Sequence, residues 1–233
     1  MPSQDLAAHP AARKVTTLAA RPSRASEVLE VLRTAIVSGE IVPGSLHSVA
    51  ELASSFGVSR TPVREALIEL AGRGMVRFER NRGVRVLQTS VHDLEEIFEL
   101  RLILEVTATR RAIERITPDA RRKLRAAVAG MKRASAADDA ARLWVFDRSF
   151  HHTLLVQAGN RRLADYVDSL RDMVLVRGVT TAGLSRTLDE IVDEHQVVLD
   201  FIEAGDAEGA AEAMRRHIAQ TAELIIQQES RSR

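Results

Sequence analysis

The sequence predicts a mainly α-helical protein with an N-terminal winged helix-turn-helix and a C-terminal all-helical bundle domain of six helices. Apolar residues recur at helical spacing along most of the chain from Ser26 onward. Two short segments, 75–79 and 84–87, instead mix β-branched and aromatic residues with charged ones, as strands do. After Thr89 the periodic segments are all helical, so we expect one domain at 23–89 and a second at 90–229.

The composition limits the classes of protein to which the chain can belong. A length of 233 residues with 45% hydrophobic content is enough for two domains with apolar cores. The absence of cysteine excludes disulfides, thiolate metal sites and a cysteine nucleophile. No apolar run approaches the roughly 18–20 residues that span a bilayer, and no signal-peptide pattern is present, so we expect no membrane partner and a cytoplasmic location. Residues 1–22 are predicted to be a disordered arm and 230–233 a tail.

The charge is divided unevenly between the two halves. Residues 1–90 carry 12 Lys and Arg against 8 Asp and Glu, whereas 91–233 carry 21 against 24. A basic N-terminal module joined to a mildly acidic remainder predicts that only the first half meets a polyanion. An aromatic share of 3% argues against recognition of single strands by base stacking.

Three helices and a basic hairpin are expected in the N-terminal domain. The helices are predicted from Ser26 to Gly39, over 48–56 and over 60–71, with Ser59 as N-cap of the third. The two strands are joined by 80–83, which places two arginines at the hairpin tip. This order of elements is that of a winged helix.

The segment 58–67, VSRTPVREAL, indicates what this domain contacts. It places Arg60 and Arg64 four residues apart at the start of the third helix, directly after a short helix and the turn at Gly57. A helix-turn-helix presents side chains to the DNA major groove in this way, and the guanidinium fork can pair with guanine or clamp a phosphate. The alternative for an isolated Arg pair of this kind is a solvated helix face.

Six helices are predicted after the hairpin. Their expected ranges are 90–115, 117–135, 138–158, 161–178, 186–204 and 207–228. Ser90 to Asp93 resembles a capping box, and Thr117-Pro118 is a typical helix start.

Four polar residues lie on the inward stripes of these helices, where a simple core would have hydrocarbon. They are Asp147, His151, His195 and His217. Asp147 and His151 are four apart and share a helix face, so both can bind one ion. Imidazole and carboxylate ligands suit a divalent metal ion such as Zn²⁺, Ni²⁺ or Mn²⁺. The alternative is a set of hydrogen-bonded core residues; His152 points about 100° away from His151 and is predicted to be a bystander.

These motifs are similar to those of a known family. In the N-terminal half they are Leu32-Arg33, Ile36, Gly39-Glu40-Ile41, Pro43-Gly44, Glu51-Leu52-Ala53, the segment 58–67 and Asn81-Arg82-Gly83. In the C-terminal half they are Asp147, Phe150-His151, Leu154, Glu194-His195, Met214 and His217-Ile218. Over residues 24–228 the chain resembles the GntR family of bacterial transcription regulators, in particular the FadR-type branch with an FCD effector domain.

The resemblance implies roles for individual residues. The DNA-binding residues would be Arg33, Arg60, Thr61, Arg64, Arg82 and Gly83, with the last two at a wing tip in the minor groove. The metal ligands would be Asp147, His151, His195 and His217. Arg101 matches a recurrent arginine that pairs with a carboxylate effector, although a surface ion pair with Glu105 is an equal alternative. Val49 and Ala50 depart from the family pattern, which leaves the operator sequence open.

The expected function is that of a homodimeric, ligand-responsive repressor of transcription, not an enzyme. It would bind a palindromic double-stranded DNA operator, and a small carboxylate effector would complete the coordination of the metal and pair with Arg101. One alternative is a metal-free regulator whose polar cluster binds the effector directly. Another is a helical metal-dependent hydrolase, in which a site of three His and one Asp with an open position would activate water. His92-Asp93 also matches the dipeptide of helical phosphohydrolases, although it falls in a polar first turn. The only candidate general base, Glu194, is expected to face away from the cluster.

Overall fold

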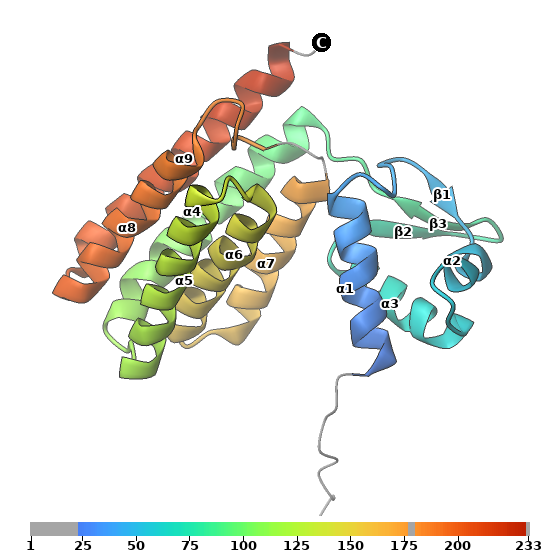
Figure 1. Ribbon diagram of the computed structural model, residues 1–233, viewed down its shortest axis with the longest axis horizontal. Helices are drawn as coiled ribbons and strands as arrows, with labels where there is room; N and C mark the ends of the chain where they lie inside the picture. The colour runs from blue at the N-terminus through green and yellow to red at the C-terminus, as the bar shows by residue number, and fades with distance from the viewer. Residues whose placement is uncertain (1–22, 177–179, 232–233) are drawn as a thin grey trace, which may run out of the picture.

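The computed structural model describes residues 23–176 and 180–231, which form two domains that lie side by side (Figure 1). The predicted arm at 1–22 and the end of the predicted tail at 232–233 lie outside the described residues. Within the described chain, no helix is both long and apolar enough to cross a membrane.

The N-terminal domain is a winged helix. Its helices are α1 (Arg24–Val37), α2 (Val49–Ser55) and α3 (Arg60–Gly72), and its strands are β1 (Leu46–His47), β2 (Val76–Glu79) and β3 (Gly83–Val86). Ser48 caps α2 in a reciprocal capping box with Glu51, whereas the Ser59 side chain makes no capping hydrogen bond at α3. The three strands form an antiparallel sheet in the order β1-β3-β2.

The core of this domain is apolar. Residues from α1, α3 and the sheet are almost completely buried, among them Leu32, Ile36, Val63, Leu67, Leu70, Val76 and Val84. The buried residues of α1 and α3 recur three or four positions apart, so the helical stripes predicted from the sequence are confirmed.

Strand β1 was not predicted, and it explains the glycine after the hairpin turn. Leu46 pairs with Arg85 and His47 with Val84. Gly83 has a φ of +123°, and a Cβ on it would lie 2.3 Å from the His47 carbonyl oxygen. Only glycine allows β1 to approach β3 this closely. Gly83 therefore forms the base of the wing, and the turn itself contains Asn81, whose φ is +59°.

The C-terminal domain consists of six helices in the described residues. They are α4 (Val91–Ile113), α5 (Pro118–Ala136), α6 (Ala140–Gln157), α7 (Arg161–Val176), α8 (Leu188–Ala204) and α9 (Ala207–Arg231). The capping box of Ser90 with Asp93 is present, and Thr117 caps α5 as predicted. Helix α9 continues to Arg231, beyond the predicted end at 228. The prediction ended too early because the last turns are polar and carry no apolar period.

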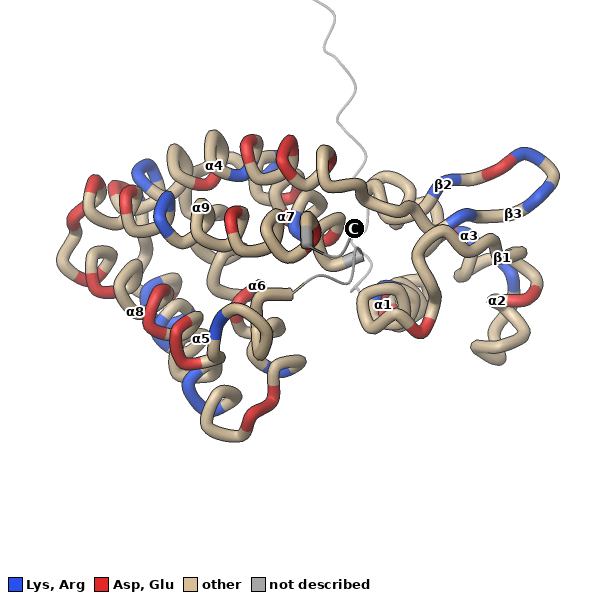
Figure 2. Tube along the Cα trace, turned by 90° about the horizontal axis from the view of Figure 1, so that it is seen from above, with Lys and Arg blue, Asp and Glu red and all other residues tan. Residues whose placement is uncertain are grey.

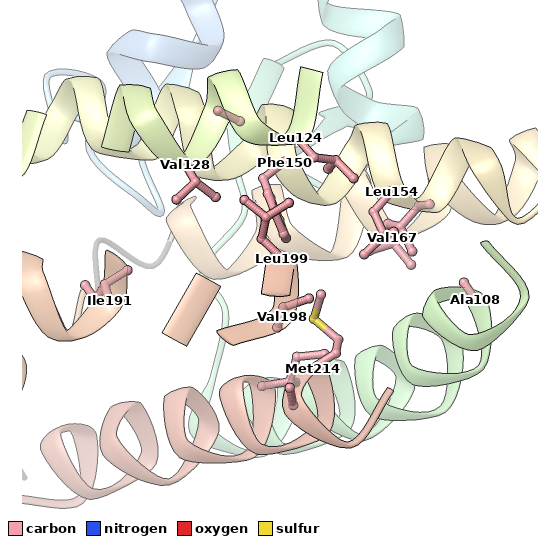
Figure 3. Packing of buried hydrophobic residues seen from close by; sticks show 14 of the residues in the cluster. Ala108, Leu124, Val128, Phe150, Leu154, Val167, Ile191, Val198, Leu199 and Met214 are labelled. Carbon is pink, nitrogen blue, oxygen red and sulfur yellow. The ribbon is translucent and has the colours of Figure 1, made fainter. Parts of the chain in front are cut away.

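The helices pack around one continuous apolar core. Figure 3 shows side chains from several helices in this cluster, among them Phe150 and Leu154 of α6, Val167 of α7 and Val198 and Leu199 of α8. The pairs α4 with α9 and α5 with α6 make the most extensive helix contacts. Unlike the N-terminal core, this core also encloses charged side chains.

Candidate metal centre and nucleic-acid interface

The four polar residues predicted as metal ligands meet inside the C-terminal domain. Asp147 and His151 come from successive turns of α6, His195 from α8 and His217 from α9. One ligand atom from each residue lies within 4.8 Å of those of the other three. All four side chains are buried.

The ring nitrogens face one another and the Asp147 carboxylate. His195 Nε2 lies 3.1 Å from Asp147 Oδ1 and 3.3 Å from His151 Nε2. His151 Nε2 is 3.9 Å from the same carboxylate oxygen, and the rings of His195 and His217 are 4.5 Å apart at their centroids. Lone pairs brought this close without a hydrogen between them repel, so a shared cation or a shared proton would stabilise the cluster.

Each imidazole directs its other nitrogen, Nδ1, toward an oxygen acceptor. The acceptors are Glu105 Oε2 for His151 at 2.8 Å, the Ile191 carbonyl for His195 at 2.7 Å and Glu194 Oε2 for His217 at 2.7 Å. A carbonyl oxygen only accepts, so His195 Nδ1 carries a hydrogen. Ionised carboxylates impose the same tautomer on the other two rings. Metal-binding histidines are oriented in this way, with Nε2 left as the ligand atom.

The surroundings of His151 and His217 keep these two rings neutral. Burial, with the nearby Arg171, lowers the pKa of His151 to about 3. Burial, with the neighbouring His195, lowers the pKa of His217 to about 4. Neutral imidazole is the form that binds metal, so neither ring has to lose a proton before a metal ion binds at pH 7.

Asp147 is held in its ionised form. Burial acts to raise the pKa of its carboxyl, but the guanidinium of Arg171 on α7, together with His195 and His151, outweighs burial and lowers the pKa well below its usual value. Arg171 donates a hydrogen bond to Oδ2, which leaves Oδ1 directed at the histidines. One carboxylate and three neutral imidazoles suit Zn²⁺, Ni²⁺ or Mn²⁺, so the donor set fits a divalent cation.

Arg101 and Glu105 of α4 lie beside this cluster. Both are buried, and Arg101 Nε donates to Glu105 Oε1 at 2.6 Å. Of the two alternatives for Arg101, the ion pair with Glu105 is present, but it is enclosed and does not lie at the surface. Burial acts to raise the pKa of Glu105, and Arg101 with His151 lowers it well below the usual value. The buried residues of α4 include 94, 98, 101, 105, 108 and 112, a helical stripe that could have shown from the sequence that both residues point inward.

Glu194 corrects another expectation. It was expected to face away from the cluster, but its carboxylate accepts a hydrogen bond from His217 Nδ1. Arg186, in the segment before α8, donates to both oxygens of Glu194 at 2.8 and 2.6 Å. The periodicity of α8 places Glu194 beside its stripe, and only the packing of α9 against α8 brings His217 to it.

Two further histidines lie outside the cluster. His152 is 44% exposed and pairs with Asp168 at 2.8 Å, so it does not contribute to the cluster. His92, in the dipeptide that suggested a hydrolase, is 77% exposed and lies near Glu95.

The predicted DNA-contacting residues of α3 lie on its exposed face. Arg60, Thr61 and Arg64 are exposed, whereas Val63 and Leu67 on the opposite face enter the core. Within the described part of the chain, Arg60 and Arg64 make no ion pair. Arg82 is 64% exposed beside the hairpin turn and lies 3.1 Å from Glu79. Figure 2 shows basic residues gathered at the tip of the β2–β3 hairpin.

Arg33 has a different environment from the other predicted DNA contacts. Its side chain is 15% exposed and its guanidinium lies 2.9 Å from Asp172 of α7. It points at the C-terminal domain, and this ion pair occupies the group that was expected to meet a phosphate.

Comparison with known proteins identifies both domains. The family model described as "Bacterial regulatory proteins, gntR family" matches residues 24–86, and the FCD domain model matches 96–220. A "Probable D-xylose utilization operon transcriptional repressor" of Paenarthrobacter nicotinovorans is 30% identical, over 85% of this chain and 87% of that protein. The HTH-type transcriptional repressor RspR of Escherichia coli K12 is 28% identical, over 86% and 88%. The solved structure of E. coli McbR/YncC shares the fold, with a TM-score of 0.78 at 23% identity, and 89% of this chain and 99% of that one are covered.

Proposed function

The chain belongs to the GntR family of bacterial transcription regulators with an FCD domain, and we propose that it is a metal-assisted, carboxylate-responsive repressor that binds its operator as a dimer. It is a DNA-binding regulator and not an enzyme. Because a regulator of this kind acts on the chromosome, we also propose that it works in the cytoplasm.

The observation that carries the proposal is the convergence of Asp147, His151, His195 and His217, buried in the domain joined to the winged helix. The converging nitrogens and Asp147 Oδ1 repel one another unless they share a cation or a proton, and the group is buried in the FCD domain. Its three histidines are fixed by acceptors on Nδ1, which prepares the Nε2 atoms to bind a cation.

On the DNA side, we propose that α3 enters the major groove. Arg60, Thr61 and Arg64 at its N-terminal end would contact bases or phosphates, and Arg82 of the wing would contact the neighbouring groove or backbone. Two chains related by a two-fold axis would read a palindrome, since each presents one such helix. Arg33 is left out of this set because it pairs with Asp172.

On the effector side, Asp147 Oδ1 and the three Nε2 atoms would hold a divalent cation. The cation supplies a Lewis-acid anchor to which an effector carboxylate can bind. Arg101 would pair with a carboxylate of the same effector, in competition with its present partner Glu105. The effector changes DNA affinity only to the extent that it binds one arrangement of the two DNA-binding domains better than another.

A metal-free regulator is the second candidate, and one observation favours it. Arg171 already compensates the charge of Asp147, so the cluster does not need a cation to balance that carboxylate. In this case Arg171 and the histidines would bind the effector carboxylate directly.

The test uses untagged full-length chain in metal-loaded and chelator-stripped forms. Selection from a random pool of duplex DNA should yield a palindromic sequence, which then serves as probe in titrations. Both forms are screened by thermal shift against small mono-, di- and hydroxy-carboxylic acids, since ligands of the native state raise its midpoint.

The proposal expects a shift with one class of acid that disappears on stripping and is accompanied by weaker operator binding. A shift of equal size in both forms would support the metal-free regulator. If no acid changed the midpoint or operator affinity in either form, both versions of the effector site would be rejected.

A further inference from the structure

Asp172 of α7 is a completely buried carboxylate that forms ion pairs with three arginines. Its oxygens lie 2.9 Å from Arg33, 3.5 Å from Arg73 and 2.5 Å from Arg148. Arg33 is on α1 and Arg73 follows α3, so two of the three come from the DNA-binding domain. Arg148 is on α6 of the FCD domain.

Each arginine also has a second acidic neighbour, but none of these crosses the domain boundary. Arg33 lies 3.9 Å from Glu30 of its own helix, and Arg73 lies 2.5 Å from Glu69. Among the residues that the structure describes, the ion pairs that join the two domains all end on Asp172. This one carboxylate therefore provides the charged contact between the domains.

The residue after Asp172 completes the contact. The main-chain oxygen of Met173 accepts a hydrogen bond from Thr89 Oγ1 at 3.0 Å, in the connection between the domains. A Cβ on Gly74 would lie 3.1 Å from Met173 Sδ, so the turn after α3 packs closely on this side chain. Helices α1 and α7 lie side by side where these contacts occur (Figure 1).

The residue before Asp172 points in a different direction, into the histidine cluster. Arg171 donates to Asp147 Oδ2, while Oδ1 of the same carboxylate lies 3.1 Å from His195. Successive residues of a helix point about 100° apart, so one turn of α7 reaches the cluster and the DNA-binding domain at once. A helix is rigid over so short a distance, and a shift of Arg171 moves Asp172 with it.

We propose that Asp172 is the positioning residue that sets the placement of the DNA-binding domain, and that residues 171–173 transmit the state of the cluster to it. The transmission rests on the proposed function of the cluster, whereas the positioning role of Asp172 does not. A cation held at Oδ1 compensates the same negative charge that Arg171 compensates at Oδ2. When a cation is bound at the cluster, the attraction between Asp147 and Arg171 of α7 therefore weakens. The contact of Asp172 with its three arginines then moves or loosens.

The test is a distance measurement within one chain. Because the protein has no cysteine, fluorophores can be attached through Val31→Cys on α1 and Val145→Cys on α6, which are 51% and 65% exposed. Labelled protein is mixed with excess unlabelled protein, so that any dimer carries one labelled chain. Energy transfer between single pairs then reports the distance between the domains, in chelator-stripped protein and after addition of Zn²⁺.

Asp172→Asn removes the charge with little change in size, and Asp165→Asn makes the same change at an exposed position of the same helix. We expect the metal-free distance distribution to broaden in Asp172→Asn and to match the parent in Asp165→Asn. An unchanged distribution in folded Asp172→Asn would refute the positioning role.

A second pair of variants covers the case in which Asp172→Asn does not fold. Arg33→Gln removes one ion pair across the boundary, and Arg148→Gln removes one within the FCD domain. The proposal expects a broader distribution in Arg33→Gln than in Arg148→Gln. Equal distributions in these two variants would also refute it.

The arm with Zn²⁺ tests transmission separately. We expect Zn²⁺ to shift the distance in the parent, and we expect Asp172→Asn to bind the same amount of Zn²⁺ without this shift. A metal-dependent change in operator affinity, about 5- to 150-fold for typical allosteric coupling, should shrink toward no change in the variant.

If Asp172→Asn kept the full shift, transmission through residues 171–173 would be wrong. If the parent bound no Zn²⁺, the proposed metal site would fail while the metal-free distances would still decide the role of Asp172.

Discussion

The two domains place their polar functional groups in opposite ways. Among described residues 23–88 of the DNA-binding domain, the buried residues are apolar, and the candidate DNA contacts Arg60, Thr61, Arg64 and Arg82 are on the surface. The FCD domain encloses charged and ionisable side chains within its core, namely Arg101, Glu105, Asp147, His151, Asp172, Arg186, His195 and His217.

The difference indicates how function and stability are related in each half. Surface arginines can be replaced at little cost to folding, because water already solvates them. Buried charged groups stabilise the fold only while their partners are present, and removal of one partner leaves the other unpaired. Binding and stability should therefore be separable in the first domain and inseparable in the second.

The largest expected effect is on operator affinity, in Arg64→Ala. Loss of an arginine contact to a base costs about 1–3 kcal/mol, and a dimer loses it in both half-sites, so we expect affinity to fall at least about 30-fold. The free energy of unfolding should stay within about 0.5 kcal/mol of that of the parent, because Arg64 is exposed. Fluorescence anisotropy with operator DNA and thermal unfolding measure the two quantities.

The matched control for this variant is Glu65→Ala, which removes the neighbouring exposed charge. It should keep or increase operator affinity. Full affinity in Arg64→Ala would show that α3 is not the recognition helix.

Removal of the metal should have the next largest effect, and it should act on stability. A ligand present at about 1,000 times its dissociation constant stabilises the native state by about 4 kcal/mol, so chelation should lower the unfolding midpoint by several degrees. His195→Ala should abolish metal binding and this shift, whereas His152→Ala, outside the cluster, should retain both. Metal analysis and calorimetry of the two variants provide the check, and equal metal content in both would refute the assigned site.

Acidification of the metal-free protein should produce a smaller loss of stability that originates in the FCD domain. The pKa values of His151 and His217 in the folded chain, about 3 and about 4, are below the usual value of 6.5. The unfolded chain therefore binds more protons below about pH 6.5, and the unfolding free energy should be highest above that pH and fall toward pH 4.

Urea unfolding at pH 7 and pH 5 should show this loss of unfolding free energy. It should be smaller in His217→Gln than in the parent and unchanged in the exposed-site variant His92→Gln; identical pH dependence in all three would contradict the prediction.

The smallest expected effect is at the wing. Arg82→Ala should weaken binding to all DNA sequences alike and reduce the salt dependence of log K by about 1 for each phosphate contact that is lost. The control is Arg161→Ala, an exposed arginine on α7 that lies outside the winged helix. A change in base preference, with no change in salt dependence, would mean that Arg82 reads bases and not phosphates.

The same contrast explains which features the sequence could predict. Local signals predicted the helix starts, since the capping residues Ser90 and Thr117 act within one turn. Helical periodicity also brought Asp147, His151, His195 and His217 to inward faces, because each stripe is a property of its own helix. Strand β1 was missed because two residues carry no period.

The partners of buried charges could not be predicted in this way. Arg33 and Asp172 are 139 positions apart, and their contact depends on how one domain is placed against the other. The same is true of Arg171 and Glu194, whose roles appear only when α7 packs near α6 and α9 near α8. Charge pairing across elements requires the tertiary arrangement, whereas capping and amphipathicity do not.

The three-arginine contact at Asp172 has a consequence for the engineering of chimeric regulators. Domain boundaries suggest a junction in the connection near Thr89, where one DNA-binding domain would be exchanged for another. A graft made there would inherit Asp172 without Arg33 and Arg73, and it would bury a carboxylate with only Arg148 to meet it. A compatible donor domain therefore needs a basic residue at both positions and a small residue in place of Gly74, so that the grafted head fits α7.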